Sequence, residues 1–253
     1  MSYTYTTVIE RGGTGKTTTS AFIWHELNRR GFKTLAVDYD PQMNLSLYAG
    51  VKMADNSIYD AITGDKPVGS CIYTTKYGDI IPGARALATI PANPDATPTM
   101  LKKALKPVQK EYQYIVIDTA RGLDLNPLNA LMASDAVVIP AGADTFTIDG
   151  IIETLETVQA VQKQNKGLRV AGILLTRYKK TKTAEHIAEY VRNVIGPENN
   201  VAVFNTPIRE SVKVTDAQAR LMSLMDYAPK SPQALDYLAF IDDLLNQGGR
   251  NNE

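Results

Sequence analysis

The stretch VIERGGTGKTTTS, residues 8–20, combines closely spaced glycines with a lysine and neighbouring hydroxyl side chains. In a glycine-rich loop the backbone N–H groups can point at phosphate oxygens, because no Cβ atoms block their approach. Lys16 can bind phosphate oxygens, and the Thr17 hydroxyl can act as a Mg²⁺ ligand. The pattern predicts a phosphate-binding loop. Its glycines, its lysine and its threonines are Gly12, Gly13, Thr14, Gly15, Lys16, Thr17 and Thr18.

The context of this loop supports the prediction. An apolar, β-rich run precedes it and a helical pattern follows, so the N-terminus of a helix is also expected to face the phosphates. The alternative is a glycine turn that carries a surface lysine. A strand before the loop and a helix after it favour the nucleotide site.

Three aspartates follow apolar runs of the kind that form buried strands. Asp38 and Asp40 occur in LAVDYDPQMN, and Asp118 occurs in YIVIDTARG. In a doubly wound sheet, ligands bind at the carboxyl ends of the strands. An aspartate at a strand end is also ordinary turn chemistry. Their arrangement together with the loop predicts a Mg²⁺-nucleotide site, with Asp118 holding Mg²⁺ through water.

The elements that position these residues alternate between short apolar runs and longer amphipathic ones. This alternation is typical of βαβ units, so we expect one doubly wound, mainly parallel α/β sheet flanked by helices. We expect residues 1–246 to form a single domain and residues 247–253 to form a flexible tail. Strands are predicted near residues 4–9, 34–37, 114–117, 136–139, 170–175 and 201–204.

Helices are predicted from the loop to about Arg30, and from a Thr97 N-cap with Pro98 at the first helical position. Further helices are predicted over residues 147–164, 183–194, 212–222 and 232–245. Between residues 50 and 98 proline and glycine are frequent, and the hydrophobic residues show no clear helical or strand periodicity.

Composition sets broad limits on function. Lys plus Arg equals Asp plus Glu at 27 each, so no global field attracts nucleic acid or membrane. The single cysteine, Cys71, cannot form an internal disulfide and fits a reducing compartment. The N-terminus lacks a signal-peptide pattern and no window reaches the length of a membrane span. We expect a cytoplasmic protein.

Five stretches, in this order along the chain, resemble the ParA family of deviant Walker A ATPases, in the group that contains MinD and the nitrogenase iron protein. They are RGGTGKTTTS, LAVDYDPQMNLS, YIVIDTARGLDLNPLNAL, DAVVIPAGADTFTIDGI and TPIRESVKVTDAQA. The resemblance implies a P-loop NTPase that uses ATP and Mg²⁺ and forms an ATP-bound homodimer on non-specific DNA. It also implies release by a centromere-binding ParB-type adaptor, in the segregation of a plasmid or chromosome on the nucleoid.

The resemblance also assigns roles to particular residues. Lys16 matches the catalytic phosphate-binding lysine, Thr17 the Mg²⁺ ligand and Thr18 a neighbouring phosphate contact. Asp40 matches the carboxylate that orients the attacking water. Asp38 matches a Mg²⁺-side carboxylate, Asp118 matches the Walker B aspartate, and Pro207 and Ile208 match neighbours of adenine.

The chain departs from the family pattern at two positions. Arg11 replaces the signature lysine, whose charge reaches the partner's phosphates, and arginine differs from lysine in size and geometry. Three interpretations of Arg11 remain open. It acts on the partner's phosphates as lysine does, or it permits the ATP-bound dimer but slows hydrolysis. In the third, it pairs with a local acid such as Glu10 and has no role in the partner's site. Ala120 and Arg121 replace two prolines after the Walker B strand, and Arg121 is either a second interface cation or simply solvated.

A basic cluster follows the strand predicted near residues 170–175. The residues proposed to contact DNA are Arg177, Lys179, Lys180, Lys182, Arg209 and Lys213. Such clusters are often only solvated, and the resemblance is what favours DNA. A MinD-like membrane-cycling ATPase is disfavoured because the last predicted helix is acidic near its end. One cysteine excludes a nitrogenase-type reductase. A non-hydrolysing nucleotide-gated scaffold remains the alternative from another class.

Overall fold

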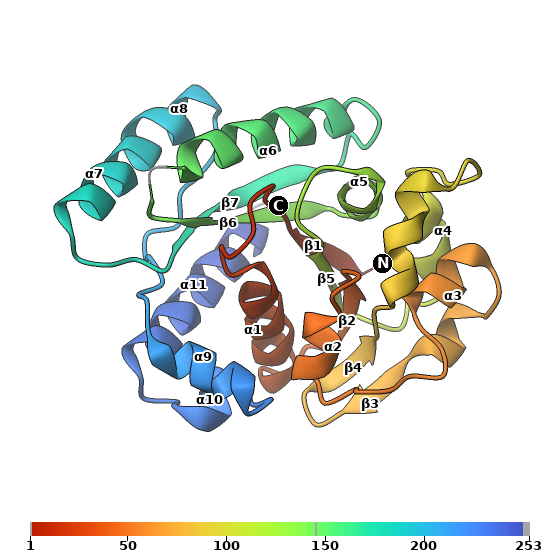
Figure 1. Ribbon diagram of the computed structural model, residues 1–253. Helices are drawn as coiled ribbons and strands as arrows, with labels where there is room; N and C mark the ends of the chain where they lie inside the picture. The colour runs from red at the N-terminus through yellow and green to blue at the C-terminus, as the bar shows by residue number, and fades with distance from the viewer. Residues whose placement is uncertain (1, 145, 250–253) are drawn as a thin grey trace.

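The computed structural model describes residues 2–144 and 146–249, and its centre is a seven-stranded sheet (Figure 1). The strand order is β3-β4-β2-β5-β1-β6-β7, parallel throughout except for the antiparallel pair β3 and β4. The strands are β1 (Tyr3–Thr7), β2 (Thr34–Tyr39), β3 (Tyr73–Thr75), β4 (Gly78–Ile81), β5 (Tyr114–Thr119), β6 (Ala136–Gly142) and β7 (Arg169–Thr176). The predicted fold class is confirmed.

Helices cover both faces of this sheet. The α-helices are α1 (Lys16–Arg29), α2 (Asn44–Tyr48), α3 (Ile58–Thr63), α4 (Met100–Leu105), α5 (Leu125–Met132), α6 (Thr147–Gln162), α7 (Lys182–Tyr190), α8 (Gly196–Glu198), α9 (Val212–Ala219), α10 (Leu224–Tyr227) and α11 (Pro232–Gly249). Two 3-10 segments span Val68–Cys71 and Arg85–Ala92, and a π-helical turn spans Val191–Ile195.

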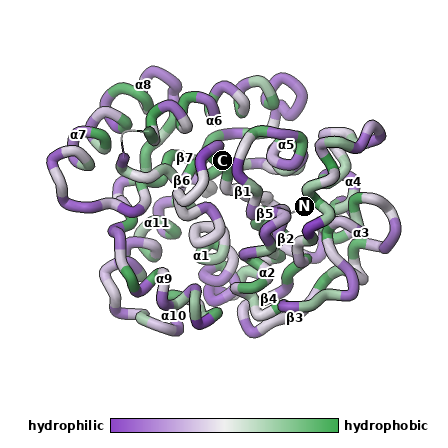
Figure 2. The backbone as a smooth tube through the Cα atoms, in the orientation of Figure 1, coloured by the Kyte–Doolittle hydropathy of each residue, from purple (hydrophilic) through white to green (hydrophobic). Residues whose placement is uncertain are grey.

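The strands are buried on both faces, and alternate residues enter different cores. Along β2, Leu35 and Val37 pack with α3 and α4, whereas Ala36 packs with α1 and α2. The blue segments α9 to α11 lie on the same side of the sheet as α1, whereas α6 lies over β6 and β7 on the other side, with α7 and α8 next to it (Figure 1). Figure 2 shows hydrophobic stretches concentrated along the central strands, while the loop before α7 is hydrophilic. Burial on both faces explains the continuous apolar runs in the sequence.

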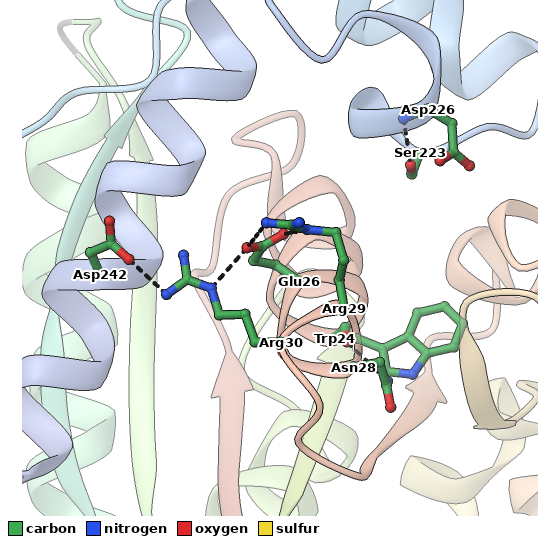
Figure 3. A network of polar contacts seen from close by, with 8 residues as sticks. All are labelled: Trp24, Glu26, Asn28, Arg29, Arg30, Ser223, Asp226 and Asp242. Atoms are coloured by element: carbon green, nitrogen blue, oxygen red, sulfur yellow. Dashed lines mark hydrogen bonds and ion pairs between the residues drawn. The ribbon is translucent and has the colours of Figure 1, made fainter.

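Helix α1 is joined to the neighbouring α11 by a charged network (Figure 3). The fully buried Glu26 side chain accepts hydrogen bonds from Arg29 Nε at 2.6 Å and Arg30 Nε at 2.8 Å. Arg30 continues to Asp242 of α11, where Nη1 lies 2.6 Å from Oδ1. Burial alone would raise the pKa of Glu26, but the hydrogen bonds and charges of Arg29 and Arg30 lower it. The network therefore stabilises the ionised carboxylate.

We expect Glu26→Gln to lower the free energy of unfolding at pH 7 by about 1–3 kcal/mol, because the charge-assisted hydrogen bonds from Arg29 and Arg30 are weakened. Since folding lowers the pKa of Glu26, its contribution is present above its ordinary value of 4.5 and disappears as the pH falls through the folded value. Urea unfolding at pH 7 and pH 4 measures both effects. Asp242→Asn is the control, because that carboxylate is 59% exposed and its loss should cost less than about 1 kcal/mol. Equal losses in the two variants would contradict this account of the network.

Two sequence predictions about secondary structure are wrong. Residues 201–204 form an isolated bridge between Val203 and Ile173 rather than a strand. The helix expected to start after Thr97 begins at Met100 instead, because Thr97 lies in a turn where its carbonyl accepts from Asn129 Nδ2 at 3.0 Å. That helix ends at Leu105, two residues before Pro107, whose ring cannot continue it.

The C-terminal helix α11 extends to Gly249, beyond the predicted end at residue 245. Residues 250–253 of the expected tail lie outside the described residues. None of the helices that the structure describes combines the length and apolarity needed to span a bilayer.

Candidate nucleotide-binding site

The loop between β1 and α1 has the backbone geometry of an anion site. Gly13 and Gly15 have φ of 75° and 85°, a left-handed conformation that side-chain-bearing residues rarely adopt. Gly15 is the N-cap of the 14-residue helix α1, so the helix begins directly at Lys16. The unpaired N–H groups of the first turn and the helix dipole both favour a bound anion there.

Lys16 is folded beneath this loop rather than extended into solvent. Its Nζ donates to the carbonyl oxygens of Ile9 at 3.1 Å and Arg11 at 2.9 Å, and the residue is only 8% exposed. Burial lowers the pKa of Lys16, while the charges of Asp118 and Asp40 oppose that shift. The ammonium group is therefore held at the phosphate loop by two backbone carbonyls, which carry no net charge.

Asp118 lies at the end of β5 and is fully buried. Its Oδ1 accepts from Ser20 Oγ at 3.0 Å, but its Oδ2 is buried with no hydrogen-bond partner in the part of the chain described. Burial, followed by the charge of Asp38, raises the pKa of Asp118 to about 7. An orphaned carboxylate oxygen next to Thr17 fits a site for Mg²⁺ held through water.

Asp38 lies near the end of β2 and Asp40 follows the strand, and their side chains have different environments. Asp38 pairs in register with Asp118 across the sheet, and its Oδ2 accepts from the N–H and Oγ of Ser46 at 2.7 and 2.6 Å. Burial raises the pKa of Asp38 to about 6. Asp40 is partly exposed, and its Oδ1 accepts from Gln42 N–H at 2.8 Å. Asp38 thus anchors the start of α2, whereas Asp40 faces open space.

A cleft of about 960 Å³ opens at the phosphate loop. Among the predicted residues it is lined by Gly12, Gly13, Thr14, Gly15, Lys16, Thr17, Thr18, Asp40, Ile208, Arg177 and Arg209. Its lining does not include Pro207, nor the buried Asp38 and Asp118. The phosphate loop, Asp40 and the late segment around Ile208 therefore share one cleft.

Several lining residues were missed by the sequence analysis. Gln218 of α9 donates from Nε2 to Thr18 Oγ1 at 2.7 Å, and Tyr237 of α11 also lines the cleft. Thr176 at the end of β7 donates to the Thr14 carbonyl at 2.7 Å and so supports the loop. The resemblance at residues 206–219 was the only signal that could have located Gln218. Nothing local marked Thr176 or Tyr237.

Arg11 points toward the segment between β6 and α6. Its Nη1 lies 3.9 Å from Asp144 Oδ1, and its guanidinium carbon lies 4.8 Å from the centre of the Phe146 ring. A Cβ at Gly150 would lie 3.1 Å from Arg11 Cγ, so the glycine leaves room for the chain. The local acid beside Arg11 is thus Asp144, while Glu10 lies beside Glu153 and raises the pKa of that residue.

The predicted basic cluster is partly neutralised. Glu210 pairs with Arg177 at 3.1 Å and with Lys179 at 2.7 Å, and Arg209 pairs with Asp236 at 2.6 Å. Arg177 also donates to the Gly13 carbonyl at 3.1 Å, which ties it to the phosphate loop. Lys180, Lys182 and Lys213 are exposed and form no ion pair with any residue in 2–144 or 146–249.

The chemistry available in the cleft is anion binding rather than a protein cage for a metal. No group of three or more His, Cys, Asp or Glu side chains that could hold a metal gathers among the described residues. A metal here would need ligands from a nucleotide and water in addition to Thr17 and Asp118. The residues present fit such a shared site.

The raised pKa of Asp118 gives a pH prediction for the metal-free protein. The folded state holds a proton that the unfolded state releases near pH 3.8, so stability falls as the pH rises from there to about 7. The pKa of the neighbouring Asp38 is also raised, to about 6, so the two buried carboxyls contribute to this loss together, and the lowered pKa of His25 opposes it. Urea unfolding in the presence of a chelator should show this slope in the wild type and a weaker slope in Asp118→Asn. Parallel curves would contradict the assignment.

Comparisons with known sequences and structures place this site in context. The family model described as AAA domain matches residues 5–170. The sporulation initiation inhibitor protein Soj of Bacillus subtilis is 34% identical over 250 residues, covering 94% of this chain and 96% of that protein. The chromosome partitioning protein ParA of Myxococcus xanthus is 31% identical over 255 residues, covering 94% and 86%.

Solved structures also resemble this chain. Cobyrinic acid a,c-diamide synthase from Mycobacterium smegmatis, with bound ADP and magnesium, has a TM-score of 0.85 at 26% identity, covering 98% of this chain and 96% of that one. The septum site-determining protein MinD from Pyrococcus horikoshii, complexed with Mg-ADP, has a TM-score of 0.81 at 25% identity, covering 99% and 98%.

Proposed function

Because the chain belongs to the ParA family of ATPases, we propose that it binds ATP with Mg²⁺, hydrolyses ATP, and couples its nucleotide state to self-association on DNA. The observation that carries this proposal is the cleft in which the phosphate loop, Lys16 and Asp40 meet the segment around Ile208. The nucleotides and magnesium in the related structures support the choice of ligand.

Different residues at the cleft are proposed to bind the phosphates, the base, Mg²⁺ and the attacking water. Lys16 and the N-terminus of α1 bind the phosphates, and Ile208, Val214 and Tyr237 provide an apolar end for the base. Thr17 directly and Asp118 through water would hold Mg²⁺, which supplies neutralisation of phosphate charge when bound. Asp38 positions the segment of Asp40 through its bond to the Asp40 N–H at 3.3 Å. Asp40 orients the attacking water.

Arg11 is proposed to act on the partner subunit in an ATP-bound homodimer. Its side chain is 42% exposed, and its pairing with the 62% exposed Asp144 is weak enough to be exchanged for a phosphate contact. Arginine can bind phosphate through two parallel hydrogen bonds, which a lysine cannot do. The contacts with Asp144 and Phe146 also favour the second candidate, an ATP-gated dimer that hydrolyses slowly or serves as a scaffold.

The mass of the protein in solution, measured with a slowly hydrolysed ATP analogue and with ADP, tests this proposal. We expect a dimer with the analogue and a monomer with ADP, and about a tenfold weaker dimer in Arg11→Ala. Arg11→Lys should retain the dimer, and Lys166→Ala provides a charge control outside the cleft. A monomer in every state, or a dimer indifferent to Arg11→Ala, would contradict the role of Arg11.

DNA binding is proposed to involve the basic cluster, in which the exposed Lys180, Lys182 and Lys213 form no ion pair within the part of the chain that the structure describes. A dimer would present these cations twice, which raises affinity for the DNA backbone steeply. A centromere-binding ParB-type adaptor is the proposed stimulator of hydrolysis, and segregation of a plasmid or chromosome on the nucleoid is the proposed role. The Soj and ParA relatives support this assignment.

A further inference from the structure

Arg121 lines the cleft together with the phosphate loop. It follows β5 in the segment Thr119–Gly122, and it is exposed and lines the cleft. Its Cδ lies 3.8 Å from the position that a Cβ would take on Gly12, so a side chain at residue 12 would touch Arg121. The aliphatic part of Arg121 is therefore a neighbour of the phosphate loop.

The guanidinium of Arg121 is not neutralised by the protein. It has no hydrogen bond or ion pair with residues 2–144 or 146–249, whereas Arg177, Arg209 and Arg11 all have acidic partners. The charge of Arg121 contributes to lowering the pKa of Lys16, so the two cations lie within electrostatic range. Two cations that line the same loop and act on each other electrostatically favour a bound anion there.

The backbone on both sides of Arg121 is fixed. Thr119 donates from Oγ1 to the Thr7 carbonyl at 2.8 Å, and the Gly122 N–H donates to the Glu10 carbonyl at 3.0 Å. Gly122 has φ of 91°, which favours glycine at this position. The side chain is thus presented from a short anchored segment beside the phosphate loop.

The lining of the cleft is mixed in character. It includes the apolar Ile208 and Val214 as well as the charged Lys16 and Arg121. A nucleotide with its base against the apolar residues would place its phosphates at the phosphate loop, where Lys16 and Arg121 both line the cleft. The terminal phosphate is the group that ATP has and ADP lacks, so a cation at this loop can distinguish the two nucleotides.

We propose that Arg121 binds the terminal phosphate of ATP within its own subunit and so distinguishes ATP from ADP. This inference rests on the proposed nucleotide function of the cleft. Arg121 and Arg11 then have separate roles, because Arg11 contacts Asp144 and Phe146 instead of the cleft. The planar guanidinium of Arg121 can bind a phosphate through two hydrogen bonds, and a lysine at this position would replace that contact only in part.

Calorimetric titration of the full chain with Mg²⁺ and either ADP or a slowly hydrolysed ATP analogue tests the proposal. We expect Arg121→Ala to weaken the analogue about tenfold or more, while ADP affinity changes less than about twofold. Arg121→Lys should recover part of the loss. Lys166→Ala removes an exposed positive charge outside the cleft and should change neither affinity.

Retained ADP affinity also shows that the Arg121→Ala variant is folded. An unchanged ratio of the two affinities in Arg121→Ala, or an equal loss for both nucleotides, would overturn the proposal. A loss of analogue affinity in Arg121→Ala that disappears at protein concentrations too low for the wild type to dimerise would assign the contact to the partner's nucleotide and would overturn action within one subunit. A wild-type protein that binds neither nucleotide would overturn the proposed function itself, which is a different result from a failure at Arg121.

Discussion

Asp40→Ala is expected to slow ATP turnover by about 10²- to 10⁴-fold, the range associated with loss of a positioned proton acceptor. ATP affinity should change little, because Asp40 is partly exposed and the only hydrogen bond of its side chain among the described residues is to the Gln42 N–H. The carboxylate lines the cleft with Lys16 and is free to orient a water molecule. Its contribution is therefore expected in the transition state more than in binding.

Single-turnover phosphate release and analogue binding separate these two effects. Asp40→Asn keeps the shape and the bond to Gln42 but cannot accept the proton as well, so it should be nearly as slow as the alanine variant. Asp65→Ala serves as the control, since Asp65 lies outside the cleft. Unchanged turnover in Asp40→Ala would remove Asp40 from the mechanism.

The second large effect is expected at Lys16. Lys16→Ala should weaken both ATP and ADP by about a hundredfold or more, because a buried charge-assisted contact to phosphate is lost. The carbonyls of Ile9 and Arg11 also lose their donor, so the loop conformation loses a support. This result differs from that for Asp40, where binding persists and turnover fails.

Calorimetric titration with each nucleotide measures the loss, and circular dichroism checks that the variant folds. Lys33→Ala is a matched control, because Lys33 is held against the Tyr112 ring away from the cleft. Affinities within a few-fold of the wild type in Lys16→Ala would show that nucleotide binds elsewhere.

The elements that hold the site were predictable because their signals are local. Strands β2 and β5 are buried on both faces, so they appear as apolar runs that end in Asp38 and Asp118. Parallel pairing places those two residues in register, as expected for strand ends at one edge of a sheet. The loop and α1 followed from the glycines and from Lys16 in the same way.

The remaining parts depend on contacts between distant segments. Residues 201–204 have a strand-like composition, but only Val203 pairs with β7, which no local pattern reveals. Asp236 neutralises Arg209 from 27 residues away, and Glu210 neutralises Arg177 from 33 residues away. The basic cluster therefore carries less free charge than its sequence indicates.

The most direct test of the central claim is binding to random-sequence duplex DNA at moderate salt, with ATP and then with ADP. The account predicts tight, salt-sensitive binding with ATP alone, weakened in Lys180→Ala and Lys182→Ala. Arg11→Lys should retain the response to ATP. Binding that is equal with both nucleotides, or absent with both in the wild type and in Arg11→Lys, would contradict the claim that ATP in this cleft controls association with DNA.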